Sequence, residues 1–165
     1  MEYRPQGYFE QVVPVALNLT KELNNTAADK VFLAANARGG QGLAFTQEVK
    51  MVKAFLIILG DVENTYDGEN GIDCTTATHN QWQWDLNNGG FADLANGANA
   101  DGQMLDNDWR CASKGAARSF AYQFDITSAL TDVDGNIGIK LANGRAEQDG
   151  LNVTIHAYLK IVWKA

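Results

Sequence analysis

Cysteine, proline and histidine are scarce in this chain, which has two of each among 165 residues. So few cysteines exclude a dense disulfide scaffold, and one domain of this length buries a sufficient core without such bridges. The longest apolar run, AFLIILG at 54–60, has the length of a buried strand and is too short to span a membrane. The N-terminal MEYRPQGYFEQ has no basic or apolar signal segment, so we expect no secretory signal.

Basic residues are nearly absent from one third of the chain. Residues 61–116 contain ten Asp and Glu against Arg110 and Lys114, whereas the remainder has ten acidic and eleven basic residues. This acidic, loop-rich region therefore carries −8 and the rest +1, which together give the net −7 of the chain. It would repel nucleic acid, and no basic stripe elsewhere compensates, so nucleic-acid binding is not expected.

Motifs of common catalytic sites are absent as well. The chain has no G-x-S-x-G, no H-E-x-x-H, no phosphate-binding loop and no cysteine–histidine–asparagine pattern. Its carboxylates are numerous, but nothing selects a pair for glycoside hydrolysis. We therefore expect a protein that is not an enzyme.

Alternation of apolar and polar residues is the dominant pattern, and it predicts strands. It runs without interruption through 151–163, which we expect to be a long, half-buried strand. Similar patterns predict further strands at 11–19, 30–36, 42–49, 118–126 and 136–141. The first of these has an apolar face made of Val13, Val15, Leu17 and Leu19. Pro14 on its opposite face suits an edge strand or a bulge.

Residues 46–60 fit both a helical and a strand pattern. The β-branched and aromatic run before Gly60 favours a strand whose two faces are both covered. Helix signals are few: one or two turns at 20–29, capped by Thr20, and a single turn after 125, capped by Asp125 or Thr127. Eight or nine strands predict that residues 1–165 form a single all-β domain, an antiparallel β-sandwich, and among sandwiches we favour a jelly roll.

Tryptophans occur in two different settings. Trp82, Trp84 and Leu86 in QWQWDL share one face of a strand, which predicts a buried face rather than an aromatic platform for sugar rings. Trp109, in contrast, lies between Asp106 and Asp108 on one side and Arg110 on the other. An aromatic ring among such groups is typical of carbohydrate sites, although Asp and Asn also simply form turns.

We expect no cofactor other than calcium, for which the acidic residues after 60 raise the hypothesis of a binding site. Ca²⁺ takes six to eight oxygen ligands, but the spacing here is not that of an EF-hand, and a solvated acidic turn is the alternative. The candidate ligands are Asp61, Glu63, Asp67, Glu69 and Asp73, with Asn64 and Asn70 between them.

Cys74 and Cys111 bracket much of the same region. A disulfide between them would stabilise the chain by closing a long loop, whereas two buried thiols are the alternative. A zinc site that adds His79 and His156 lacks a second tightly spaced pair of ligands, so we favour it least. His156 lies on the polar face of its strand and is expected at the surface or at an interface.

The chain has a recognisable order of segments. They are an extended N-terminal arm at 1–20, the strands FAYQFDI and NIGIKL, and the closing strand IHAYLKIVW. This order resembles small jelly-roll virion proteins, such as the cement or decoration proteins of tailed-phage capsids, and the trimeric C1q/TNF-type heads of fibres. The resemblance implies a non-catalytic protein of the virion, assembled in the host cytoplasm. It also implies a homo-oligomer, with a trimer favoured, and it assigns no functional residue.

Two classes of function follow. The first is a structural protein that docks on copies of itself and on a larger shell or fibre, because the doubly apolar strand at 51–59 needs a cover. The second is a carbohydrate- or receptor-binding module of the cell exterior, with surface glycans bound at Trp109 and calcium ordering 61–73. FDITSAL at 124–130 resembles segments of galactose-binding-like sandwiches. No membrane partner is expected in either case.

Overall fold

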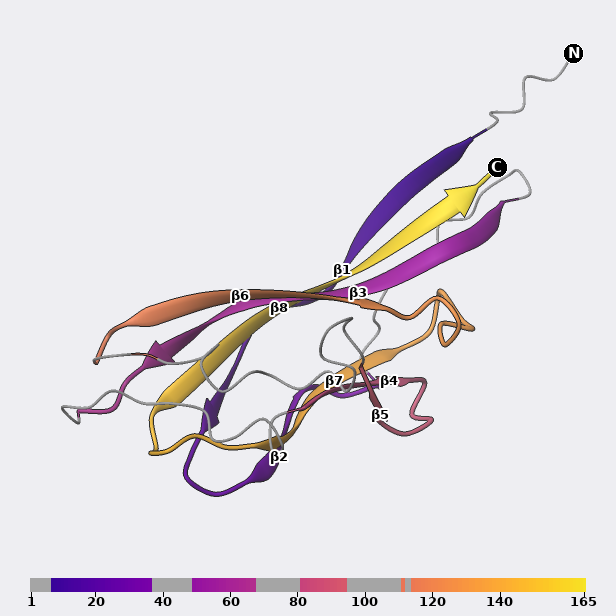
Figure 1. Cartoon of the computed structure of the whole chain (residues 1–165). Coiled ribbons are helices and arrows are strands. Elements are labelled where there is room, and N and C mark those ends of the chain that lie inside the picture. The colour runs from indigo at the N-terminus through magenta and orange to yellow at the C-terminus, as the bar shows by residue number, and fades with distance from the viewer. Residues whose placement is uncertain (1–6, 37–48, 68–80, 95–110, 112–113) are drawn as a thin grey trace, which may run out of the picture.

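The computed structural model describes residues 7–36, 49–67, 81–94, 111 and 114–165. Every regular element in these ranges is a strand (Figure 1). The strands are β1 (Tyr8–Leu23), β2 (Ala28–Leu33), β3 (Lys50–Asn64), β4 (Gln81–Leu86), β5 (Ala92–Asp93), β6 (Ala117–Asp125), β7 (Ile137–Gly144) and β8 (Leu151–Lys164). None of these ranges holds a helix with the length and hydropathy needed to span a bilayer.

The strands pair from the two ends of the chain inward. β1 pairs with β8, β2 with β7, β3 with β6 and β4 with β5, all antiparallel. β8 also pairs with β3, and β7 with β4. The result is a long sheet in the order β1-β8-β3-β6 and a short sheet in the order β2-β7-β4-β5. The predicted all-β antiparallel sandwich is confirmed.

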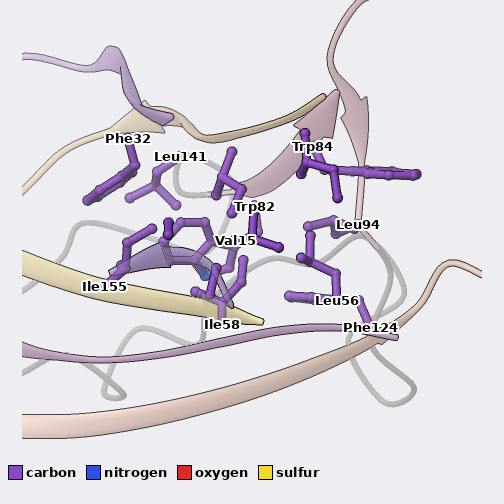
Figure 2. Close-up of a cluster of buried hydrophobic side chains, with 14 of the residues drawn as sticks. Val15, Phe32, Leu56, Ile58, Trp82, Trp84, Leu94, Phe124, Leu141 and Ile155 are labelled. Atoms are coloured by element: carbon purple, nitrogen blue, oxygen red, sulfur yellow. The ribbon is translucent and has the colours of Figure 1, made fainter. Parts of the chain in front are cut away.

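The core lies between the two sheets, and β8 shows how the sequence builds it. Its odd-numbered residues from Leu151 to Trp163 are all buried, whereas the even-numbered ones from Asn152 to Val162 are half-buried on the opposite face. The predicted alternation is therefore confirmed over the whole strand. Figure 2 shows side chains of both sheets meeting in this layer, among them Ile155, Leu56, Trp82 and Leu141.

The long sheet extends beyond the short one. β6 pairs only with Phe55–Glu63 of β3, whereas the β3–β8 ladder continues to Lys50 and Lys164. In Figure 1 the first half of β1, the first half of β3 and the last half of β8 project past the short sheet as a three-stranded ribbon. The short sheet lies on one side of the long sheet, and we call the opposite side of the long sheet its outer face.

The strand expected within 46–60 is confirmed, because β3 covers Lys50–Asn64. Its inward residues Ala54, Leu56 and Ile58 are fully buried, but outward Leu59 remains 36% exposed, so no part of the described chain covers the second face. The strand expected at 30–36 lies slightly earlier, as β2. Most of the strand expected at 42–49 lies outside the described residues.

The apolar face predicted for 11–19 is only partly correct. Val15 is buried, but Leu17 is 56% exposed because the β1–β8 register shifts between Pro14 and Ala16 and again between Ala16 and Leu19. These shifts form a bulge that turns Leu17 outward. The prediction for Pro14 is confirmed, since it lies on an edge strand and next to the bulge.

Of the two predicted helical turns, one is wrong. Thr20 caps no helix, because residues 20–23 continue β1 and pair with β8 up to Leu23, which lies opposite Leu151. The single turn after β6 is confirmed: the N–H groups of Ala129 and Leu130 donate to the carbonyl of Ile126 over 3.0 and 2.9 Å.

Candidate functional site

The predicted carbohydrate site falls outside the described residues. This applies to Trp109, Asp106 and Asp108, so glycan binding there stays a prediction. The other tryptophans are placed: Trp82 is fully buried and Trp84 is 5% exposed. The ring of Trp82 packs between those of Phe32 and Phe120, with centroids 5.7 and 6.2 Å away. The interpretation of Trp82 and Trp84 as core residues is confirmed.

Three of the five calcium candidates are described, and they do not converge. Asp61 and Glu63 lie within β3, opposite Thr154 and Asn152 of β8 and therefore on the outer face. Asp67 forms an ion pair of 2.8 Å with Lys114. No group of three His, Cys, Asp or Glu residues suited to a metal occurs in the described part of the chain. The calcium hypothesis also needs Glu69 and Asp73, which lie outside that part, and it stays a prediction.

Cys111 is buried beside the end of β3. Its thiol donates to the carbonyl of Val62 over 3.5 Å, and its own carbonyl accepts from Nδ2 of Asn64 over 3.2 Å. The fully buried Asn64 also accepts from the N–H of Tyr66 over 2.8 Å. Asn64 thus satisfies its polar groups by joining β3 to neighbouring backbone. Cys74 lies outside the described residues, so the disulfide stays a prediction.

His156 lies on the outer face of β8, as the alternation predicts, and not near Cys111. Its Nδ1 accepts a hydrogen bond of 3.1 Å from the backbone N–H of Asn18 at the β1 bulge. Cys111 belongs to the core on the other side of the same sheet. The structure therefore does not bring these two zinc candidates together.

The outer face of the long sheet is the most distinctive surface of the described chain. Five large hydrophobic side chains of the described residues are exposed, and four of them, Tyr8, Val12, Leu17 and Leu59, belong to β1 and β3 of the long sheet. The register places Tyr8, Val12 and Leu59 on the outer face, and Leu17 lies in the β1 bulge between Ala16 and Leu19. Half-buried apolar side chains of β3 and β8 lie between them. The latter are Phe55, Ile57, Tyr158 and Val162. The result is a broad apolar surface over three strands.

Charged side chains collect at the two ends of this outer face. Glu22, Asp61 and Glu63 lie at the end where β8 begins. Four lysines lie at the opposite end, together with two carboxylates that pair with them. The lysines are Lys50, Lys53, Lys160 and Lys164, and the carboxylates are Glu10 and Asp125. The face therefore has an acidic end, an apolar centre and a basic end.

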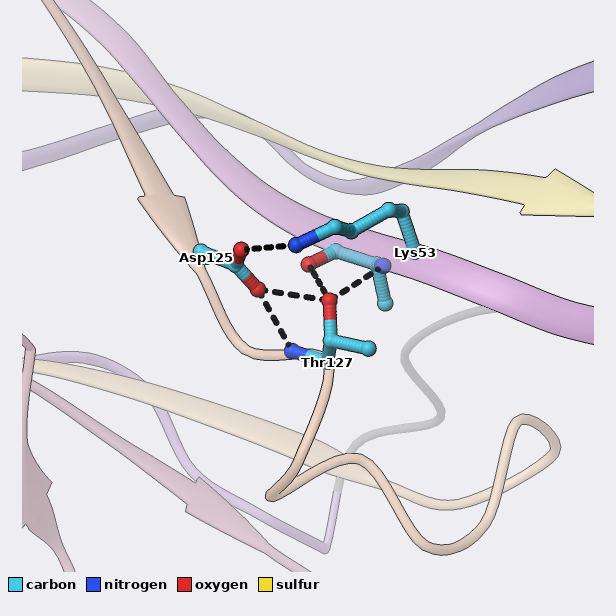
Figure 3. A network of polar contacts seen from close by, with 4 residues as sticks. Lys53, Asp125 and Thr127 are labelled. Carbon is cyan, nitrogen blue, oxygen red and sulfur yellow. Dashed lines mark hydrogen bonds and ion pairs between the residues drawn. The ribbon is translucent and has the colours of Figure 1, made fainter.

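One polar network fixes the basic end (Figure 3). Lys53 on β3 forms an ion pair of 2.9 Å with Asp125, the last residue of β6. The second carboxylate oxygen of Asp125 accepts from the hydroxyl and the N–H of Thr127. The Thr127 hydroxyl hydrogen bond, followed by the backbone bond and by Lys53, lowers the pKa of Asp125 from 3.8 to about 2. Asp125 is therefore ionised at neutral pH and balances Lys53.

Sequence reasoning found part of this surface. The apolar second face of 51–59 is visible in the sequence, but the contributions of Val12 and Leu17 are not, because they depend on the pairing of β1 with β8 and on the bulge. Local charge gives only part of the acidic end, since Asp61 and Glu63 belong to the acidic region after 60 whereas Glu22 comes from β1. Only the strand order brings them together.

Comparison with known proteins identifies no family for this chain. No protein-family model matches the chain, and no curated protein matches it. One similar solved chain comes from the crystal structure of the T13 IBDV viral particle, described in relation to the evolution of icosahedral viruses. The sequence identity is 5% and the TM-score 0.34, over 95% of the present chain. The match covers 35% of the viral chain, so the present chain spans about a third of its length.

Proposed function

We propose that this chain is a non-catalytic structural protein that acts as a subunit of a larger protein assembly of the virion type. The observation that carries the proposal is the outer face of the long sheet. Monomeric proteins rarely expose a broad apolar surface, and such surfaces usually contact a partner. Here four of the five exposed large hydrophobic side chains of the described residues share that one face.

The strand order supports the virion-type part of the proposal. The first strand pairs with the last, the second with the seventh, and so on inward. One long antiparallel hairpin gives this pattern when it wraps into two sheets. We take the eight described strands to form a jelly roll, a fold used by viral capsid and lectin domains. Because the fold serves several functions, the exposed surface decides between them.

Solution mass tests the proposal. Light scattering on the purified full chain over a range of concentrations should give masses above the 18.0 kDa of a single copy. The trimer expected from the sequence stays a prediction that the same measurement checks. A chain that stays monomeric up to its solubility limit would contradict self-assembly. Repeating the measurement with EDTA tests calcium separately, because a metal-ordered loop should change the mass or the melting temperature.

A further inference from the structure

We infer that the outer face of the long sheet binds the same face of a second copy of this chain, in a two-fold arrangement with the strands of the two copies running in opposite directions. The inference rests on the proposed function and deepens it by naming the surface and the partner. It depends on three features of that face: its apolar centre, the separation of its charges and its size.

The centre of the face is apolar across neighbouring strands. Pro14, Tyr158 and Ile57 lie side by side on β1, β8 and β3, since Tyr158 pairs with both of the others. Toward the acidic end, Leu59 flanks this row beside His156, and Leu17 lies in the β1 bulge. Toward the basic end, Val12 and Phe55 flank it on either side of Lys160. Removing apolar side chains from water is favourable, and packing against another apolar surface achieves this for both surfaces at once.

The charges make the face complementary to itself. Among the described residues, its acidic end has three carboxylates and no lysine, whereas its basic end has four lysines and two carboxylates. Tyr158 lies midway along β8 between Asn152 at the acidic end and Lys164 at the basic end. A two-fold axis that lies between the two sheets and runs along the row of Tyr158, across the strands, therefore places each acidic end over the basic end of the second copy.

Individual pairs follow from the register. With the axis at Ile57, β3 of one copy lies over β3 of the other and runs in the opposite direction. Glu63 of one copy then faces Lys50 of the other, and Asp61 faces Lys53. A parallel arrangement would instead place like charges together and would be unfavourable. In a two-fold contact every such pair occurs twice, so a single surface supplies both halves of the interface.

The size of the face is sufficient for a stable contact. Strands rise about 3.3 Å per residue and lie about 4.8 Å apart, so the face is roughly 50 Å by 15 Å, or about 700 Å². Stable protein pairs bury about 800 Å² per partner, and two sheets pack face to face about 10 Å apart. Two copies of this face therefore provide an interface of ordinary size.

The test compares two exposed apolar positions on different sheets. Leu59→Lys places a charge in the outer face at a side chain that is 36% exposed, and Val31→Lys makes the same change on β2 of the short sheet, where Val31 is 40% exposed. Sedimentation equilibrium of the full chain should give a dimer for the wild type. Leu59→Lys should raise its dissociation constant about tenfold or more, and Val31→Lys should leave it unchanged.

Charge exchange tests the direction of packing. Glu63→Lys should weaken the dimer because it then faces Lys50 of the second copy, and the double variant with Lys50→Glu should restore it. Circular dichroism should match the wild type in all variants, and so should the melting temperature at concentrations low enough for every chain to be monomeric, since both positions are exposed. Failure of the double variant to restore the dimer would overturn the antiparallel arrangement.

The outcomes separate this inference from the proposed function. Association that Leu59→Lys leaves unchanged would overturn the outer face as the interface while leaving self-assembly in place. A trimer as the smallest assembly would overturn the two-fold arrangement. A wild-type chain that is monomeric at every concentration would contradict both proposals.

Discussion

Lys53 and Asp125 join β3 to β6 through an ion pair of 2.9 Å at the point where β6 ends. Thr127 holds the same carboxylate from the following turn, and its backbone N–H lies 2.9 Å from Oδ1. Its hydroxyl also lies 3.0 Å from the backbone N of Ala54, which donates to it. Side-chain contacts therefore attach the turn after β6 to β3, and the backbone pairing of β3 with β6 stays intact.

The acid stability of the chain should depend on Asp125. Its pKa is lowered from 3.8 to about 2 in the folded chain, so its contribution is complete above about pH 4 and is lost as the pH falls toward 2. Asp125→Asn should remove that dependence and lower the stability at pH 7 by less than about 1 kcal/mol, because the pair is half exposed. Urea unfolding between pH 2 and 7 measures both effects. Glu147→Gln, at an exposed position of the β7–β8 connection, should follow the wild type.

Gly60 should tolerate no side chain. A Cβ atom at this position would overlap the carbonyl oxygen of Thr154 on β8 and would lie 2.7 Å from the ring of Phe120 on β6. Backbone cannot move aside as a flexible side chain can, so Gly60→Ala should destabilise the fold by about 3 kcal/mol or more. Ala121→Ser, on the exposed face of β6, should change the stability by less than about 0.5 kcal/mol. An equal effect of the two variants would contradict this account.

The fold could be predicted from the sequence wherever one face of a strand is buried along its whole length. β8 is the best example, because the core takes every second side chain from Leu151 to Trp163. No signal in the local sequence indicates that the residues after Thr20 form a strand instead of the expected helical turns. Those residues extend β1 only because β8, far along the chain, offers a partner up to Leu151. Distant pairing outweighed local preference there.

The candidate interface shows the same division. The apolar outer side of β3 could be predicted because Phe55, Ile57 and Leu59 alternate with buried residues and none of them is polar. The exposure of Leu17 could not, since the bulge that turns it outward has no local sequence signal. The separation of charges also required the strand order.

Trp82 should contribute more to stability than any exposed aromatic residue. It is fully buried between Phe32 and Phe120, whereas Tyr8 is 66% exposed near the start of β1. Trp82→Ala should cost about 3–5 kcal/mol through the cavity that it leaves, and Tyr8→Ala less than about 1 kcal/mol. Chemical denaturation of both variants compares them directly. A small loss for Trp82→Ala would mean that the ring is not part of the core.

The β1 bulge should depend on the backbone conformation of Asn18. Asn18 has a φ of 55°, in the left-handed region that Asn and Gly tolerate and β-branched residues do not. Asn18→Gly should therefore change the stability by less than about 0.5 kcal/mol, whereas Asn18→Val should cost about 1–2 kcal/mol.

The control for this prediction is Lys21→Val, which makes the same kind of change in the regular part of β1, where the pairing with β8 is continuous. It should be neutral within about 0.5 kcal/mol because strands accept valine readily. Thermal melts of the three variants measure the comparison. If Asn18→Gly loses as much stability as Asn18→Val, the amide side chain rather than the dihedral angle holds the bulge, and the hydrogen bond from the Asn18 N–H to His156 would not be sufficient to fix it.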